Sequence, residues 1–244
     1  MNSLIKEIDQ EGLATLSVIE KADKFNRWMY ETIAPHCKGK ILEIGSGIGN
    51  LSQCFVDDNR NITLSDLRDN YCAILQDKFD NPVEKIDLVH QDFDAQYLHL
   101  LGTFDTVFAL NVIEHIQNDV LALKNCHKLL KSSGHIVILV PAYQFLFNNF
   151  DIELEHFRRY QKKSLSTAIQ AGGFRIKKLF AFNLIGILGW YVTGNLMQKK
   201  LIPEGQMGLF NYLVPVFKIA DFFTFKRVGL SVICFGEKNT AACQ

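Results

Sequence analysis

The sequence predicts an α/β fold in which a mostly parallel sheet of seven strands carries helices on both faces. Two observations lead to this prediction. From residue 40 onward short apolar runs alternate with amphipathic stretches, and the first of these runs ends in a glycine-rich turn. With 244 residues, of which 48% are hydrophobic and 21% charged, the chain can bury such a sheet within one large domain.

Seven apolar runs have the length and the branched or aromatic content that are typical of buried strands. They lie at residues 40–44, 61–66, 85–89, 104–110, 135–140, 174–182 and 228–236. Helical spacing of apolar residues and good helix formers predict helices at residues 50–56, 71–79, 119–131 and 164–171. Residues 22–33 predict one more helix, because Phe25, Trp28 and Met29 share one of its faces.

The charge balance argues against nucleic acid as a partner. Basic and acidic residues number 26 each, so the chain lacks a basic field that could hold a phosphate backbone. The six cysteines form no Cys-x-x-Cys pair, and the residues after Met1 lack the apolar stretch of a signal peptide. We therefore expect reduced thiols, a cytoplasmic protein and no metal centre.

The segment 179–198 contains no charged residue and has the length of a membrane span, with Lys178 and Lys199 on either side. Three glycines and several polar residues interrupt it. Apolar runs of ambiguous period are common in protein cores. The sequence therefore favours a buried strand followed by an apolar helix over a true membrane span.

The segment from Ile41 to Asn50 is the most informative part of the chain. A buried strand ends here in Gly45, Gly47 and Gly49, and a helix follows. Such a turn lets the backbone pass close to a ligand, which the helix amide groups then face. The dinucleotide fingerprint would require its third glycine at position 50, so the pattern disfavours a pyrophosphate ligand.

Glu43 places a carboxylate two residues ahead of the first glycine. It would repel a diphosphate and attract the cationic end of a ligand. S-adenosylmethionine carries an ammonium and a sulfonium and no phosphate, so its charges suit an acid at this position. The alternative is a structural glutamate that is satisfied by nearby hydrogen bonds.

The stretch from Glu43 to Gly49 resembles motif I of the class I S-adenosylmethionine-dependent methyltransferases. The resemblance implies a Rossmann-like fold whose last strand is antiparallel. It also implies a cofactor site in which Asp66 accepts the ribose hydroxyls and Leu67 lies beside the adenine. In the same way, Asp92 takes the adenine amino group while Phe93 packs against the ring. For Asp92, a turn-forming role is the alternative.

The predicted strand 104–110 leads into Asn111-Val112-Ile113-Glu114-His115, which resembles motif IV of the same family. Ligands bind beyond the carboxyl ends of parallel strands, so Asn111 and His115 should border the transferred methyl. His115 and His156 are the candidate bases, although a lone histidine is more often structural. A base is needed only if the acceptor must lose a proton.

Two flanking signatures, residues 12–30 and 151–160, are similar to a bacterial subgroup of this family, and the resemblance implies a lid and an acceptor pocket. We expect residues 1–39 to form a helical lid on a methyltransferase domain at 40–244, with acceptor-side helical insertions at 142–163 and 183–225. The acceptor candidates are Trp28 and Tyr30 in the first signature, and Arg158 and Tyr160 in the second. Core packing is the alternative for the two aromatic residues of the lid. Paired arginines can grip an anionic acceptor, or simply form a solvated turn.

We thus expect in-line transfer of a methyl group from S-adenosylmethionine to a small acceptor, apolar or lipid-linked, with positioning as the main source of rate. The apolar segments 184–197 and 209–223 could line the acceptor cavity, form a homodimer face or contact a membrane surface. Two alternatives stay open, because a fold does not fix a function. One is a catalytically silent protein that binds the cofactor or serves as a scaffold, and the other is an oxidoreductase.

Overall fold

The computed structural model describes residues 10–199 and 204–239, and in it seven strands form one sheet in the order β3-β2-β1-β4-β5-β7-β6. β1 to β5 run parallel to one another, whereas β7 is antiparallel to both of its neighbours, β5 and β6. The strands are β1 (Ile41–Ile44), β2 (Ile62–Asp66), β3 (Val83–Lys85), β4 (Phe104–Leu110), β5 (Leu130–Pro141), β6 (Phe174–Phe182) and β7 (Ser231–Lys238). The predicted fold class is confirmed, including the antiparallel last strand.

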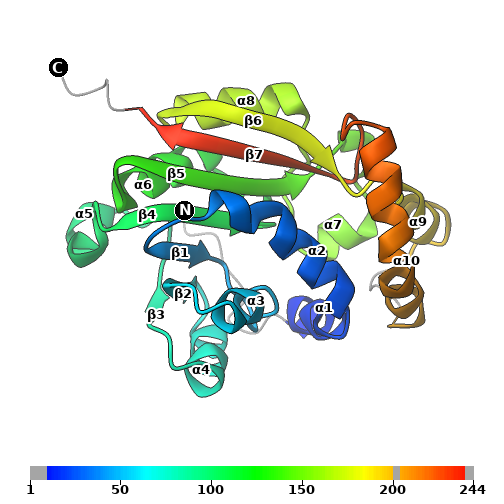
Figure 1. Ribbon diagram of the computed structural model, residues 1–244, viewed down its shortest axis with the longest axis horizontal. Helices are drawn as coiled ribbons and strands as arrows, with labels where there is room; N and C mark the ends of the chain where they lie inside the picture. Colours follow the sequence, from blue (N-terminus) through cyan, green and yellow to red (C-terminus); the bar gives the residue numbers. More distant parts are fainter. Residues whose placement is uncertain (1–9, 200–203, 240–244) are drawn as a thin grey trace.

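Helices cover both faces of the sheet, which explains why its central strands read as continuous apolar runs. One face packs on α2, α3 and α10, and the other packs on α6 and α8. Figure 1 shows α1, α7, α9 and α10 gathered beyond the carboxyl ends of β4 and β5. The helices are α1 (Gln10–Glu20), α2 (Asp23–Ile33), α3 (Ser52–Asp57), α4 (Asp69–Lys78), α5 (Phe93–Gln96), α6 (Asp119–Leu129), α7 (Asn149–Glu153), α8 (Lys162–Ala171), α9 (Gly186–Trp190) and α10 (Glu204–Phe223).

β3 is shorter than predicted and ends earlier, at Lys85, where the sequence predicted a strand at 85–89. The side chain of Asp87 accepts a hydrogen bond from the Val89 N–H at 2.9 Å, and this bond forms a turn. Local bonds of this kind compete with the ladder of a strand. Ile86 and Leu88 are still buried. Their apolar side chains pack in the core although they do not extend the strand.

The uncharged segment 179–198 begins as the end of β6, continues through α9 and finishes in a π-helical turn, Tyr191–Leu196. The prediction of a strand followed by an apolar helix is therefore confirmed. Within residues 10–199 and 204–239, no helix combines the length and the apolar character needed to cross a bilayer.

Candidate cofactor and acceptor site

The glycine turn after β1 is a tight cradle in which three residues take a left-handed backbone conformation. Gly45, Gly47 and Gly49 have φ values of 73°, 56° and 83°, in the region that favours glycine. A Cβ on Gly45 would lie 2.5 Å from Val112 Cγ2, and one on Gly47 would lie 2.9 Å from Leu16 Cδ1. Backbone groups therefore form the floor of the cradle, as the sequence predicted.

Asp66 ends β2 directly beside this cradle. Its carboxylate accepts one hydrogen bond from the Gly47 N–H at 3.0 Å and another from the Arg68 N–H at 3.1 Å. Burial raises the pKa of Asp66, while these two bonds act in the opposite direction. Each carboxylate oxygen retains a further lone pair, so ribose hydroxyls can be accepted without breaking the present bonds.

Glu43 is buried beneath the cradle. Its carboxylate accepts a hydrogen bond from the Ser52 hydroxyl. Burial raises the pKa of Glu43 to about 7, the hydroxyls of Ser52 and Ser46 lower it, and the charge of Asp66 raises it again. Two buried acids beside a glycine turn suit a ligand with a positive end and would repel a diphosphate. The donor set therefore fits S-adenosylmethionine.

Helix α1, which the sequence predicted to be part of a lid, contacts the glycine turn. The Asn50 side chain donates a hydrogen bond to the Leu16 carbonyl at 2.8 Å, and the Asn26 side chain donates to the Ile19 carbonyl at 2.9 Å. Asn50 occupies the position where the dinucleotide fingerprint has a glycine. In this chain that position binds α1, which gives the departure from the fingerprint a structural role.

The sequence predicted the adenine side of the site at Asp92 and Phe93. Asp92 is exposed just ahead of α5, and Phe93 is buried in the core against Tyr97, with ring centroids 4.8 Å apart. β3 ends at Lys85, four residues before the predicted end of this strand, so Asp87 is the first acid after it in the sequence. Leu67, directly after β2, is half-buried.

Asn111 follows β4 directly; it has a positive φ of 54° and donates its N–H to the Leu139 carbonyl at 2.8 Å. Asparagine is one of the few residues other than glycine that tolerate this conformation. The sharp bend starts a short 3₁₀ turn, Ile113–His115, and this turn brings Glu114 and His115 to the carboxyl end of the sheet.

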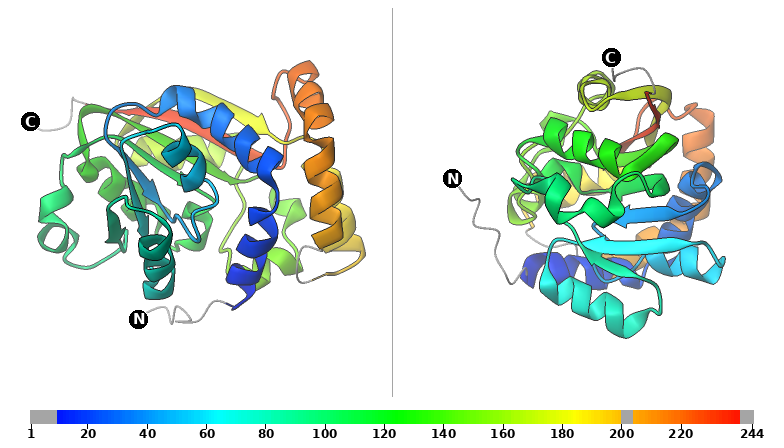
Figure 2. Two further views of the ribbon diagram at one scale, coloured as in Figure 1. Left: turned by 60° about the horizontal axis from the view of Figure 1, so that its bottom comes forward. Right: turned by 90° about the vertical axis from the view of Figure 1, so that its left-hand side faces the viewer.

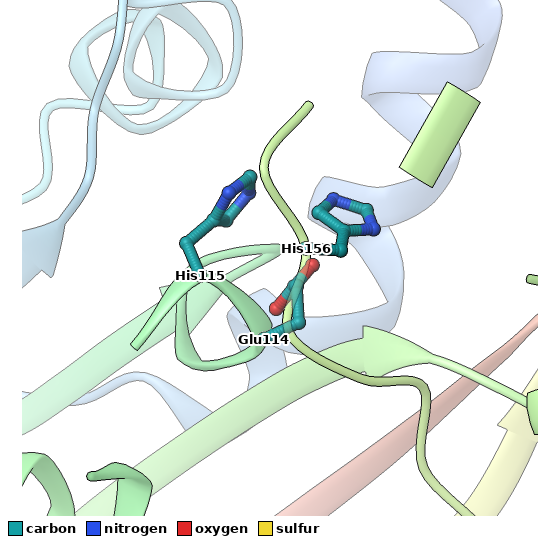
Figure 3. Close-up of side chains that lie close together, drawn as sticks. All are labelled: Glu114, His115 and His156. Carbon is teal, nitrogen blue, oxygen red and sulfur yellow. The ribbon is translucent and has the colours of Figure 1, made fainter. Parts of the chain in front are cut away.

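A second segment meets that turn, and together they form what we term the histidine cluster: Glu114, His115, Asp151, His156 and Arg159. The His115 and His156 rings meet edge to face with centroids 4.5 Å apart. His156 Nδ1 lies 2.7 Å from Asp151 Oδ1, and the same oxygen accepts a hydrogen bond from Arg159 Nε at 2.8 Å. His156 is thereby oriented with Nε2 left for a ligand. Figure 3 shows how Glu114 and His115 rise from the turn after β4 toward His156.

Glu114 is the least expected member of the histidine cluster. Its side chain is fully buried, and within the described residues neither carboxylate oxygen has a hydrogen-bond partner. Burial raises its pKa to about 8, so the group is largely protonated and neutral at pH 7. A buried carboxyl group without a partner has free capacity for the polar group of a ligand.

His115 stays neutral at physiological pH. Although part of its side chain reaches solvent, burial by the surrounding protein lowers its pKa, and the charges of His156 and Arg68 act in the same direction. A neutral imidazole can accept a proton. Together with Glu114 and His156 it also offers three ligand atoms within 4.8 Å of one another, which is a candidate cation site. The prediction of no metal centre considered only the cysteines and could not detect it.

Arg158 and Tyr160, predicted to bind the acceptor, both contact Asp119 at the start of α6. Arg158 Nη1 lies 3.0 Å from Asp119 Oδ2, and the Tyr160 hydroxyl donates to the same oxygen at 2.7 Å. The paired arginines therefore do not act together: Arg158 binds Asp119, and the buried Arg159 belongs to the histidine cluster. Arg158 and Tyr160 fix the segment that presents His156.

Trp28 and Tyr30, also predicted to bind the acceptor, lie in the core between α2 and the sheet. Trp28 packs against Phe182 with ring centroids 4.3 Å apart. The Tyr30 hydroxyl donates to Asp58, and its ring meets Phe55 edge to face. Helix α2 turns both rings inward because its apolar face covers the sheet. These contacts favour the core-packing alternative for both residues.

Sequence reasoning gave no site role to Glu114 or Asp151, and it considered Arg159 only as one of two paired arginines. For Glu114 and Asp151 the signal was present, since an acid adjoins one candidate histidine and another lies five residues ahead of the second. That signal did not reveal that the two segments meet. Arg68, which follows β2, also contacts the segment that carries His156: its Nη2 lies 3.9 Å from Oε2 of Glu155.

The fold, the cradle and its two acids define a class I S-adenosylmethionine-dependent methyltransferase. The model of a family described as a methyltransferase domain matches residues 10–179. The chain belongs to this family. The match covers α1, α2 and most of the sheet and ends within β6, so α9 and α10 lie beyond it.

Individual relatives are distant. A ubiquinone biosynthesis O-methyltransferase of Pseudomonas aeruginosa (strain UCBPP-PA14) is 25% identical over 101 residues, which cover 41% of this chain and 43% of the relative. The chain spans less than half the length of the curated relatives it matches. A methyltransferase structure from Archaeoglobus fulgidus superposes with a TM-score of 0.60 at 18% identity, over 88% of this chain and 94% of the other. Phosphoethanolamine N-methyltransferase 2 of Haemonchus contortus, solved with S-adenosylhomocysteine, gives 0.61 at 15% identity, over 98% and 61% of the two chains.

Proposed function

We propose that this protein transfers a methyl group from S-adenosylmethionine to the oxygen of a small acceptor that is apolar or lipid-linked. The observation that carries the proposal is the position of the histidine cluster, which follows β4 at the same end of the sheet as the glycine cradle. The cradle and its acids hold the donor, and the histidine cluster receives the acceptor.

On the donor side, Glu43 would attract the ammonium group and Asp66 would accept the ribose hydroxyls. Leu67 would lie beside the adenine, and Asn111 would border the methyl. For the adenine amino group the structure supports Asp87 over Asp92, because Asp87 follows β3 directly. When bound, S-adenosylmethionine supplies a methyl group on a sulfonium, whose transfer is an in-line displacement that depends chiefly on alignment.

On the acceptor side, neutral His115 or Asp151-oriented His156 takes the proton that an attacking hydroxyl must lose. Asp151 carries a lowered pKa: burial alone would raise it, but the hydrogen bond to His156 and the charge of Arg159 outweigh that effect. Its negative charge stabilises a protonated His156. Glu114, which is protonated at pH 7, can donate a hydrogen bond to the acceptor. The O-methyltransferase activity named for the Pseudomonas relative supports an oxygen acceptor.

The surroundings of α1 support an apolar acceptor. A hollow of about 330 Å³ lies between α1 and α10 and has a mostly apolar lining of Val18, Lys21, Gly205, Met207 and Gly208. Trp190 of α9 lies on Arg159, with the guanidinium 4.5 Å from the ring centroid, so α9 adjoins the histidine cluster. These helices supply the extra apolar surface that an acceptor with a hydrocarbon part requires.

The test combines cofactor binding with a search for product. S-adenosylhomocysteine binding is measured by calorimetry, and the enzyme is then incubated with tritium-labelled S-adenosylmethionine and either the chloroform-soluble or the water-soluble extract of cells. We expect label in a chloroform-soluble product, lost by about 100-fold or more in His156→Ala. The control is His99→Ala, an exposed histidine of another loop.

Each result has a distinct meaning. Label in a water-soluble product alone would contradict the apolar acceptor class and retain methyl transfer. Cofactor binding without any labelled product would favour a catalytically silent protein. Full turnover in both His156→Ala and His115→Ala would remove the proton acceptor from the mechanism.

A further inference from the structure

The outer side of α10 is apolar along its whole described length. Every exposed residue between 205 and 223 is a glycine, a proline or a large apolar side chain, and none is charged. Six side chains that are 56% to 73% exposed lie at helical spacing on this side, while Val214 and Phe217 face the core. We term these six the apolar ridge: Leu209, Tyr212, Val216, Ile219, Phe222 and Phe223.

The apolar surface continues onto neighbouring elements. The Gln206 side chain of α10 accepts a hydrogen bond from the Thr193 hydroxyl at 2.8 Å, which joins α10 to the π-helical turn after α9. That turn and α9 expose Leu188, Leu196 and Met197. Figures 1 and 2 both show α9 beside α10 at this end of the molecule. Surface patches of this extent generally mark an interaction site.

Positive charges border the ridge although the chain as a whole has a net charge of zero. Lys24 Nζ lies over the Tyr212 ring at 5.4 Å from its centroid, and Arg227 lies over the ring of exposed Phe225 at 5.9 Å. Lys226 is adjacent and covers Phe180 at 4.6 Å. These three basic residues give the border a net positive charge.

The acids of the same region are already bound to protein groups. Asp221 is buried and accepts hydrogen bonds from the Asn183 and Leu184 N–H groups, each at 2.7 Å. Glu31 pairs with Lys218 at 2.7 Å, and Asp23 accepts a hydrogen bond from Asn211 at 2.6 Å. Asn211 is neutral, so Asp23 keeps its charge, while Lys218 and Glu31 offset each other. The charges that face a partner are therefore Lys24, Lys226 and Arg227 against Asp23, which leaves the border net positive.

We propose that the apolar ridge docks on an anionic lipid surface. Aromatic and aliphatic side chains on one helix side with lysine and arginine at the border are typical of helices that lie in the membrane interface. The side chains enter the boundary between headgroups and acyl chains, and the basic residues attract lipid phosphates. A second copy of this chain would instead bring like-charged borders close to each other.

This docking explains features that methyl transfer alone does not require. It places the carboxyl end of the sheet, with the lid and the histidine cluster, near the lipid surface. An acceptor with a hydrocarbon tail could then reach the site without leaving the bilayer. The inference does not depend on the identity of the acceptor, because it rests on the surface of α10 and its border.

The test uses the full chain and vesicles of phosphatidylcholine, alone or mixed with phosphatidylglycerol, in sedimentation assays. We expect binding to the mixed vesicles that weakens as salt is added. The double variant Phe222→Ser with Phe223→Ser should bind about tenfold or more weakly. The matched control replaces Leu98 and Phe145, which are equally exposed apolar residues away from the ridge, and should bind as the wild type does.

A second arm separates charge from apolar contact. Lys24→Gln with Arg227→Gln should lower affinity for the mixed vesicles by about fivefold or more and reduce its salt dependence. S-adenosylhomocysteine binding, measured on the same variants, should stay unchanged and reports the fold independently. Absence of vesicle binding by the wild type would overturn the proposal. Ridge variants that abolish a dimer in sedimentation velocity, without any vesicle binding, would assign the ridge to a second copy.

Discussion

Glu43 couples cofactor binding to protonation. Its pKa of about 7 in the free protein means that below pH 7 a proton must leave before the carboxylate can meet a cationic ligand group. We expect the affinity for S-adenosylhomocysteine to rise between about pH 5.5 and 7, approaching tenfold per pH unit at the acid end for one coupled proton. In Glu43→Gln the affinity should be lower at pH 7, and its rise with pH should be shallower. Calorimetry at several pH values measures both, and parallel curves for the two proteins would contradict this role.

Glu114 makes the free protein less stable as pH rises. Its folded pKa of about 8 lies above the unfolded value of about 4.5, so the folded state binds the extra proton in this interval. Stability is therefore greatest at the acid end and falls as the pH rises toward the folded pKa. Glu114→Gln replaces the carboxyl group by a neutral group of the same shape. Relative to the wild type, the variant should therefore gain more Tm at pH 8 than at pH 5.5. Each kcal/mol recovered corresponds to about 2 to 4 °C.

Differential scanning fluorimetry at the two pH values provides this comparison. Asp87→Asn serves as the control, since that acid is not fully buried. A Tm difference between pH 5.5 and 8 that is the same in Glu114→Gln and in the wild type would show that Glu114 is ionised in the folded protein.

At the scale of the element, the early end of β3 decides which acid faces the adenine. If Asp87 accepts the amino group, Asp87→Ala should weaken S-adenosylhomocysteine binding by about 10-fold, the value of one hydrogen bond to a charged group. Asp92→Ala should bind as the wild type does. The reverse result would restore Asp92 and the strand register that the sequence predicted.

The lid helix α1 offers a second test at this scale. Asn50→Ala removes the 2.8 Å hydrogen bond to Leu16 and should speed the release of S-adenosylhomocysteine by about 2- to 10-fold. Hydrogen exchange in residues 10–20 should increase in the same variant. Gln53→Ala, which removes a surface hydrogen bond within α3, is the matched control. Equal release rates in both variants would show that α1 does not retain the ligand.

At the scale of the whole molecule, the sequence patterns predicted contacts between residues that are close in sequence or lie on neighbouring strands, and they missed contacts between distant segments. The glycine cradle and the acids Glu43 and Asp66 lie close together in sequence or end neighbouring strands, so their meeting follows from strand order. The histidine cluster joins the turn after β4 to a loop some forty residues later, and no periodicity encodes that contact. The orientation of α2, which buries Trp28 and Tyr30, likewise depends on packing and not on sequence spacing.

The position of β7 in the sheet affects how the chain folds while it is being synthesised. It lies between β5 and β6 and pairs with both, yet its residues, Ser231–Lys238, are translated after every other strand. Until they emerge from the ribosome, β6 lacks its only strand neighbour in the described sheet, and one edge of β5 is open. Open edges invite pairing with other chains. A nascent chain stopped shortly before residue 231 would expose these edges together with the apolar surface of α10, and would need a chaperone or a lipid surface to stay out of aggregates.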